Sequence, residues 1–148
     1  MQVSVQAEPF DLGAELARLG EGQSQAGALV SFTGLVRDWP DGGLQALRLD
    51  HFPGLASREL TRLAEQAVQR FNLLDVTVIH RYGELPVGEM IVLVATLAPK
   101  RQAAFEAAEF LMDHLKTEAP FWKAEVTAEG HDWLTPSQDD TNSLHRWR

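Results

Sequence analysis

The chain has 148 residues, of which 45% are hydrophobic and 23% charged. That length fits one domain with a core of its own, and the composition argues against disorder of the whole chain. The formal net charge of −8 disfavours a broad nucleic-acid-binding face, although it allows a small basic pocket. There is no cysteine, which excludes disulfides, cysteine-ligated zinc and a thiolate nucleophile. Any reactive sulfur must therefore come from another molecule.

The sequence shows no targeting or membrane segment. Residues 1–10 lack the basic stretch and apolar run of a signal peptide. The longest apolar run, residues 90–98, is too short to span a bilayer. We therefore expect a soluble cytoplasmic protein that binds neither membrane nor nucleic acid.

In the first half of the chain, residues 11–19 predict a short helix and residues 28–36 a strand. Proline and paired glycines in residues 38–43 indicate a loop. Apolar and polar residues alternate over 47–51, which predicts a half-buried strand. The apolar stripe of residues 60–71 has helical spacing and predicts the clearest helix.

In the second half, residues 76–80 alternate as a strand, and residues 90–97 predict a buried central strand. A second long helix is expected over about 100–117, and a last main strand over 122–127. Residues 136–148 are polar and charged, so we expect a flexible tail unless a partner holds it. The order of elements predicts a single α+β domain over 1–148, with a mixed or antiparallel sheet and two main packing helices.

Familiar catalytic motifs are absent. There is no phosphate-binding loop, no dinucleotide-binding glycine pattern, no H-E-x-x-H and no G-x-S-x-G. The five histidines are scattered without ligand spacing, so no metal site is predicted. His51 and His80 fall in predicted strands, where a structural role is the more usual one.

Basic residues at the ends of elements are more informative. Arg37 ends a predicted strand, while Lys100 and Arg101 open the second long helix, where free backbone N–H groups favour an anion. Lys116 and Lys123 flank a tight, aromatic-rich turn. Two such amines depress each other's pKa and can then exchange protons near neutral pH. The alternative, that Lys116 caps the helix and Lys123 lies on the surface, is favoured by spacing alone.

Beyond these patterns, the chain resembles the large subunit of molybdopterin synthase from about residue 27 to residue 133. The resemblance is carried by residues 31–37 (S-F-T-G-L-V-R), 49–54 (L-D-H-F-P-G) and 78–85 (V-I-H-R-Y-G-E-L) with Gly88-Glu89. It continues in residues 105–107 (F-E-A) and in the long block 110–123 (F-L-M-D-H-L-K-T-E-A-P-F-W-K). The order and spacing of these pieces are more specific than any one of them.

This resemblance implies an α+β fold and a homodimer that binds one small ubiquitin-like subunit at each end, giving a heterotetramer. The small subunit's C-terminal Gly-Gly, carried as a thiocarboxylate, would enter a pocket and supply two sulfur atoms. The substrate would be cyclic pyranopterin monophosphate and the product molybdopterin, with no permanently bound cofactor. The lack of cysteine agrees with this scheme.

The resemblance also implies roles for particular residues. Lys116 would be the general acid and base beside the thiocarboxylate, and Lys123 would stabilise the substrate or an anion. Phe32 and Met112 would line the tunnel for the partner's tail, with ordinary core packing as the alternative. The substrate-binding residues would be Leu35, Val36, Arg37, Lys100, Arg101, Lys116, Lys123, Ala124 and Glu125.

Among these residues, Arg37 would bind the pterin, and Arg101 would contact the phosphate across the dimer interface. Three positions depart from the family pattern. Lys100 replaces a histidine; a lysine can hold a phosphate there but cannot shuttle protons near neutral pH as a histidine does. Leu35 and Ala124 stand where basic residues are usual. Two alternatives therefore stay open: a non-catalytic docking protein for a ubiquitin-like partner, and a stand-alone phosphate-binding domain.

Overall fold

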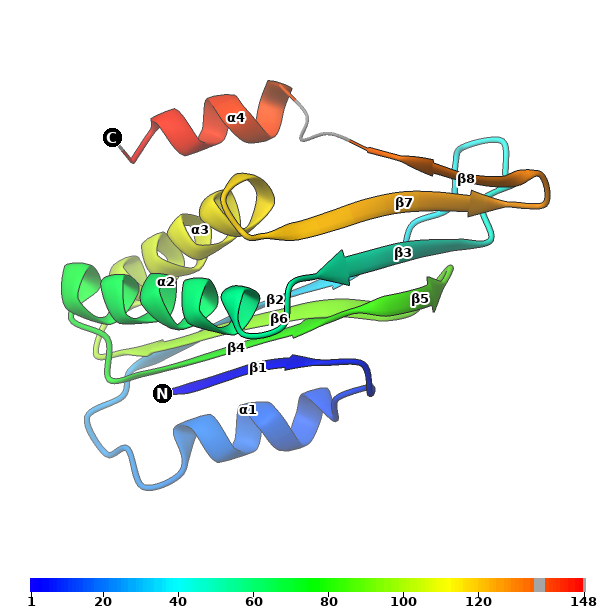
Figure 1. Ribbon diagram of the computed structural model, residues 1–148. Helices are drawn as coiled ribbons and strands as arrows, with labels where there is room; N and C mark the ends of the chain where they lie inside the picture. The colour runs from blue at the N-terminus through cyan, green and yellow to red at the C-terminus, as the bar shows by residue number, and fades with distance from the viewer. Residues whose placement is uncertain (135–137, 148) are drawn as a thin grey trace.

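The computed structural model describes residues 1–134 and 138–147, which form two four-stranded sheets and four helices (Figure 1). This arrangement confirms the predicted α+β class. The elements in chain order are β1 (Gln2–Gln6), α1 (Leu12–Gly20), β2 (Ala28–Leu35), β3 (Ala46–His51), α2 (Leu55–Phe71), β4 (Asp75–Arg81), β5 (Gly83–Pro86), β6 (Met90–Ala98), α3 (Arg101–Thr117), β7 (Phe121–Thr127), β8 (Gly130–Trp133) and α4 (Gln138–His145).

The first sheet has the strand order β1-β4-β6-β2. Strands β1 and β4 run parallel, whereas β4, β6 and β2 are antiparallel neighbours. Strand β6 is central and buried on both faces, which explains its nearly continuous apolar sequence. Its Val92 and Val94 contact one core cluster, while Leu93 and Leu97 belong to a second cluster on the opposite face. The predicted buried central strand is therefore confirmed.

Helices cover both faces of this sheet, giving three layers (Figure 1). Helices α2 and α3 pack on one face through the first core cluster, and α1 packs on the other. The small side chains of Ala104, Ala107 and Ala108 let α3 approach the sheet closely. In addition, the buried hydroxyl of Thr96 donates a hydrogen bond of 2.7 Å to the carbonyl oxygen of Ala104. This contact ties the first turn of α3 to β6.

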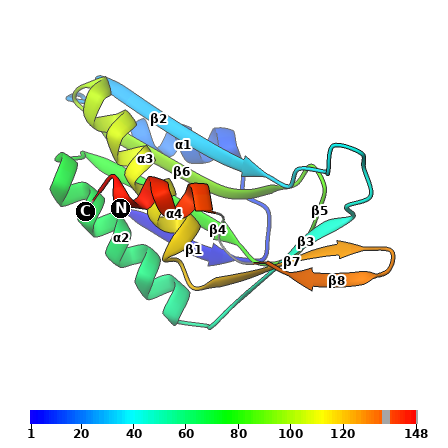
Figure 2. The same ribbon diagram turned by 90° about the horizontal axis from the view of Figure 1, so that it is seen from above.

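The second sheet is antiparallel, has the order β5-β3-β7-β8, and extends from one end of the first (Figures 1 and 2). Tyr82 alone separates β4 in the first sheet from β5 in the second. A third core cluster, with Val36, Leu44, Leu49 and Leu85 as its buried members, fills the space where the two sheets meet. Because β7 follows α3 after three residues, the end of α3 is brought to this junction.

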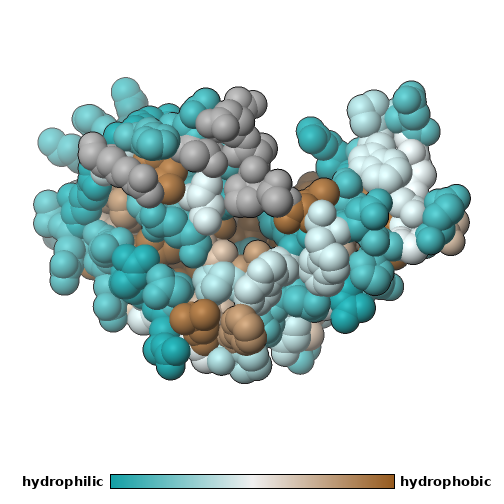
Figure 3. All heavy atoms as spheres, turned by 45° about the horizontal axis from the view of Figure 1, so that its top comes forward, coloured by the Kyte–Doolittle hydropathy of each residue, from teal (hydrophilic) through white to brown (hydrophobic). Residues whose placement is uncertain are grey.

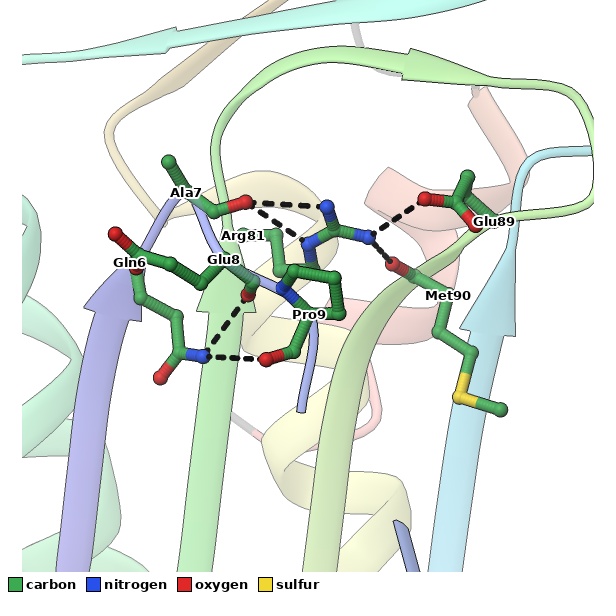
Figure 4. Close-up of polar contacts among 7 residues, drawn as sticks. All are labelled: Gln6, Ala7, Glu8, Pro9, Arg81, Glu89 and Met90. Atoms are coloured by element: carbon green, nitrogen blue, oxygen red, sulfur yellow. Dashed lines mark hydrogen bonds and ion pairs between the residues drawn. The ribbon is translucent and has the colours of Figure 1, made fainter. Parts of the chain in front are cut away.

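Arg81 fastens the junction through its buried guanidinium (Figure 4). Its Nε and Nη2 donate to the carbonyl oxygen of Ala7 at 3.2 and 3.1 Å. Its Nη1 donates to the carbonyl oxygen of Met90 at 2.9 Å and lies 3.5 Å from a carboxylate oxygen of Glu89. One side chain thus joins the segment after β1 to the start of β6.

Four elements were not predicted from the sequence: β1, β5, β8 and α4. Strand β5 has only four residues and contains Gly83 and Pro86, which indicated a connection rather than a strand. Helix α4 lies within residues 136–148, where a flexible tail was expected, and its Leu144 is buried. Residues 136, 137 and 148 lie outside the described part of the chain. Across residues 1–134 and 138–147, no helix is long and apolar enough to cross a membrane.

Replacing Arg81 with methionine should lower the free energy of unfolding by about 2–4 kcal/mol, because buried carbonyl acceptors lose a charged donor. Urea unfolding at neutral pH measures the change. Arg48→Met is the matched control, since Arg48 is half exposed and makes a surface ion pair with Asp50. We expect that control to change stability by no more than about 0.5 kcal/mol. Equal losses in the two variants would contradict the anchoring role of Arg81.

Candidate active site

Lys116 and Lys123 line one cavity at the junction of the two sheets. Lys116 lies in the last turn of α3, and Lys123 lies on β7, paired across the sheet with Leu49. The cavity has a volume of about 70 Å³. Its lining residues are Phe32, Gly34, Leu35, His80, Ile91, Val92, Met112, Leu115, Lys116 and Lys123. Apolar side chains therefore form most of the wall, and three basic side chains supply its chemistry.

Strand β2 supplies three residues of the cavity wall, Phe32, Gly34 and Leu35. Phe32 is 42% exposed and Leu35 is 56% exposed, which is high for large apolar side chains. Between them, a side chain at Gly34 would clash with the wall, because a Cβ at this position would lie 2.8 Å from Cγ1 of Val92. Met112 of α3 completes this apolar wall. The face of the molecule that carries α4, β7 and β8 is hollowed, with apolar residues in the hollow (Figure 3).

The amine of Lys123 has a lowered pKa. Burial is the main cause, because it disfavours the charged form, and the positive charge of Lys116 lowers the pKa further. Asp140 of α4 acts in the opposite direction. The alternative that Lys123 is a surface strand residue does not describe this environment. Lys123 therefore gives up its proton more readily than an exposed lysine does, which favours proton exchange closer to neutral pH.

His80 also lines the cavity, and its ring is held on two sides. It is only 6% exposed and stacks on Phe121, with ring centroids 3.8 Å apart and planes 12° from parallel. Its Nδ1 lies 2.9 Å from the carbonyl oxygen of Arg81. A carbonyl oxygen can only accept, so Nδ1 must carry the proton. In the neutral ring, Nε2 is then an acceptor.

Burial lowers the pKa of His80 to about 4, and the nearby charges of Lys123, Lys116 and His51 act in the same direction. The hydrogen bond to Arg81 opposes them. His80 is therefore neutral at neutral pH. Sequence reasoning treated this histidine as structural and missed its place in the cavity. The available signal was its alternation with Val76 and Val78, which puts His80 on the same face of β4 as these two buried residues.

Two predicted substrate-binding residues, Val36 and Arg37, lie outside the cavity lining, and Val36 has a structural role. Val36 is 2% exposed and belongs to the third core cluster. Its N–H donates to the carbonyl oxygen of Glu89 at 2.9 Å, and its own carbonyl accepts from Gly88 at 2.8 Å. Arg37 follows directly and is exposed, outside the cavity lining. Val36 thus fixes the backbone from which Arg37 extends.

The residues after Lys123 face other parts of the fold. Ala124 is fully buried and lies between β3 and β8 in the second sheet. Glu125 accepts a hydrogen bond of 2.7 Å from the indole N–H of Trp39. Because Trp39 belongs to the loop that follows Arg37, this bond ties that loop to β7.

Lys100 and Arg101 lie at the opposite end of α3 from Lys116. Fifteen residues separate Arg101 from Lys116, which corresponds to about 23 Å along a helix. Both side chains are exposed, and the first turn of α3 has neither a side-chain cap nor an acidic residue. Within one chain these two cations cannot reach the cavity.

The described residues contain no group of three or more His, Asp or Glu side chains that could hold a metal ion. What the cavity offers is two amines, one of them with a lowered pKa, beside a neutral imidazole and an apolar wall. Such a site can bind a small anionic group away from water and exchange protons with it. The fold and site thus define an α+β protein whose cavity has basic side chains suited to an anion, and the chain has no cysteine to serve as a sulfur nucleophile.

Comparison with known proteins identifies the family. The family model described as MoaE protein matches residues 5–118. A molybdopterin synthase catalytic subunit from Cereibacter sphaeroides is 52% identical over 147 residues, covering 99% of this chain and 100% of that protein. The solved structure of a molybdopterin biosynthesis MoaE protein from Burkholderia ambifaria MC40-6 has a TM-score of 0.84 and 43% identity, covering 99% of this chain and 97% of that one. Molybdopterin synthase from Staphylococcus aureus has a TM-score of 0.80 and 26% identity, covering 88% and 94%.

The chain therefore belongs to the MoaE family of molybdopterin synthase catalytic subunits. This membership makes it part of an enzyme, and it confirms the resemblance seen in the sequence.

The pKa of Lys123 should respond to the charges around it. With only three lysines in the chain, reductive ¹³C-methylation gives few NMR signals to assign. We expect the Lys123 signal to titrate below the ordinary lysine pKa of 10.5. Lys116→Met should raise the pKa of Lys123 by removing a positive charge, and Asp140→Asn should lower it. An unchanged Lys123 titration in both variants would contradict the electrostatic account.

His80 should make stability depend on pH. Its pKa is lowered from 6.5 to about 4, so the unfolded chain binds the extra proton first as the pH falls. Its contribution to stability is full above about pH 6.5 and is lost towards pH 4, by up to about 3 kcal/mol. His80→Asn should remove this part of the dependence. Urea unfolding of both proteins between pH 7 and 4 tests it: the wild type's stability relative to the variant should fall with pH, and parallel curves would refute the assignment.

Proposed function

We propose that this chain converts cyclic pyranopterin monophosphate to molybdopterin by sulfur transfer, within the biosynthesis of the molybdenum cofactor. The sulfur comes from the thiocarboxylated C-terminus of a small ubiquitin-like subunit. The observation that carries the proposal is the cavity shared by Lys116 and Lys123. Because the chain has no cysteine, a sulfur donor must come from outside.

The cavity suits the end of a Gly-Gly tail. Its small volume and apolar wall fit a chain without side chains, and Phe32 and Met112 both contribute to that wall. A thiocarboxylate entering this space loses most of its hydration. Two ammonium groups at the end of the cavity compensate, because charge pairs are strengthened where water is excluded.

The same two lysines supply proton transfer. The thiocarboxylate sulfur attacks a substrate carbon that bears an oxygen substituent. The C–S bond forms as the C–O bond of that carbon breaks, the leaving oxygen takes a proton from Lys116, and the tail is left as a thioester. Water then breaks the acyl–sulfur bond, which leaves sulfur on the product and a carboxylate on the tail. Two such transfers, each from a fresh thiocarboxylate, supply the two sulfur atoms. Lys116 acts as general acid and base beside the sulfur. Lys123 stabilises the anion while protonated, and its lowered pKa allows it to share the proton transfer.

A second copy of the chain completes the substrate site. Lys100 and Arg101 are too far along α3 to serve the cavity of their own chain, so we assign their phosphate contacts to the cavity of the partner copy. Arg37 binds the pterin at the mouth of the cavity. The assembly is then a homodimer with one small subunit at each end, a heterotetramer.

A docking protein without catalysis is the second candidate. It is favoured by Leu35, an apolar residue in the cavity wall at a position where the family has a basic one. In that case the chain would hold the small subunit's tail and release no product. The two candidates share the tail-binding step and differ only in turnover.

Lys116→Ala should abolish product formation and leave the fold intact, because an exposed helix-terminal lysine contributes at most about 1 kcal/mol to stability. The assay combines this chain, the thiocarboxylated small subunit and the cyclic pterin, and detects molybdopterin as its fluorescent oxidation product. Arg58→Ala, an exposed cation on α2, is the control and should keep full activity. Near-normal turnover by Lys116→Ala would remove the central assignment. No product from the wild type, with a stable complex, would favour the docking protein.

Mixing variants tests the shared site. Arg101→Ala alone should mainly raise KM for the pterin, since a phosphate contact is lost. At low pterin concentration, Arg101→Ala and Lys116→Ala homodimers should each be inactive. After exchange of subunits, half the dimers are mixed and each has one intact site, so about one quarter of wild-type activity should return. If activity does not return although mixed dimers form, Arg101 does not act across the interface.

A further inference from the structure

His80 is the side chain in the cavity that neither the motifs nor the proposed reaction uses. Its Nδ1 is committed to the carbonyl oxygen of Arg81, so the remaining ring nitrogen, Nε2, is an acceptor. In the described part of the chain, Nδ1 of His51 is the one side-chain nitrogen or oxygen that has neither contact with solvent nor a hydrogen-bond partner. Nε2 of His80 does not belong to this class of atoms and makes no hydrogen bond, so it has access to the cavity that the ring lines.

The other cavity side chains make this acceptor distinctive. The amines of Lys116 and Lys123 only donate hydrogen bonds while charged, and the remaining lining side chains are apolar. Among the lining residues in the described part of the chain, His80 therefore offers the strongest side-chain acceptor for a neutral N–H group, since the Met112 thioether accepts only weakly. Stacking on Phe121 and the bond to Arg81 hold the ring in place, so the acceptor is preorganised.

A peptide terminus has the complementary pattern. Its carboxylate or thiocarboxylate matches the two amines, and the amide N–H of its last residue needs an acceptor once water is excluded. We propose that Nε2 of His80 accepts the hydrogen bond of the last peptide N–H of the tail that enters the cavity, and so selects an acyl-glycine terminus over a simple carboxylate. This inference rests on the proposed function and assigns His80 a role in recognition of the partner.

The test changes one atom of the partner. A semisynthetic small subunit ending in Gly-Gly carboxylate is compared with the same protein whose last peptide bond is an ester, which removes the N–H and keeps the shape. The wild-type chain should bind the ester form roughly 3- to 10-fold more weakly, the usual effect of one neutral hydrogen bond. Calorimetry gives both dissociation constants. Because this comparison uses the wild-type chain, it does not depend on the folding of a variant.

Two substitutions at His80 separate its two nitrogens. His80→Asn can keep the bond to Arg81 but has no acceptor at the position of Nε2, so it should bind both forms equally and about as weakly as the wild type binds the ester. His80→Gln can place an oxygen near Nε2 and should restore a preference for the amide. Equal affinity of the wild type for both forms, or an undiminished preference in His80→Asn, would overturn the role of His80. If the wild type binds neither form, the proposed function itself fails.

Discussion

The pairing of β7 with β3 is the constraint on which the site depends. It sets Lys123 opposite Leu49, a fully buried residue, and so holds an amine at the edge of the core. The three-residue connection between α3 and β7 leaves little freedom, so Lys116 comes to the same cavity. Burial and the neighbouring charge then lower the pKa of Lys123. A lysine that can exchange protons is thus a consequence of strand register and a short turn.

Further hydrogen bonds hold the segments around the two lysines in place. Arg81 joins the segment after β1 to the start of β6, and its carbonyl oxygen orients the ring of His80. Glu125, two residues beyond Lys123, holds Trp39 of the loop after Arg37. Residues that make structural hydrogen bonds therefore lie next to residues that line the cavity on the same strands. This explains why several predicted substrate residues, such as Val36 and Ala124, prove to be core residues whose neighbours reach the cavity.

Much of the fold could be predicted from the sequence. The stripe of α2 and the continuous apolar run of β6 depend on local periodicity, and both were predicted. The spacing of Lys116 and Lys123 placed them at the two ends of one turn. It did not show that Lys123 is buried, because its burial depends on which strand pairs with β7. His80 was underestimated for the same reason: one histidine in an alternating strand does not reveal a cavity. Strand β5 and helix α4 were missed, since four residues with Gly83 and Pro86, and a polar tail, give weak local signals.

The central claim is that the cavity of Lys116 and Lys123 receives the end of the small subunit's tail. A crystal structure of the complex with the carboxylate form of that subunit tests it most directly. The account predicts that the terminal carboxylate lies between the two lysine Nζ atoms, within hydrogen-bond distance of both, with Phe32 and Met112 against the last two glycines. A tail that lies elsewhere on the surface, with the cavity filled by water, would contradict it.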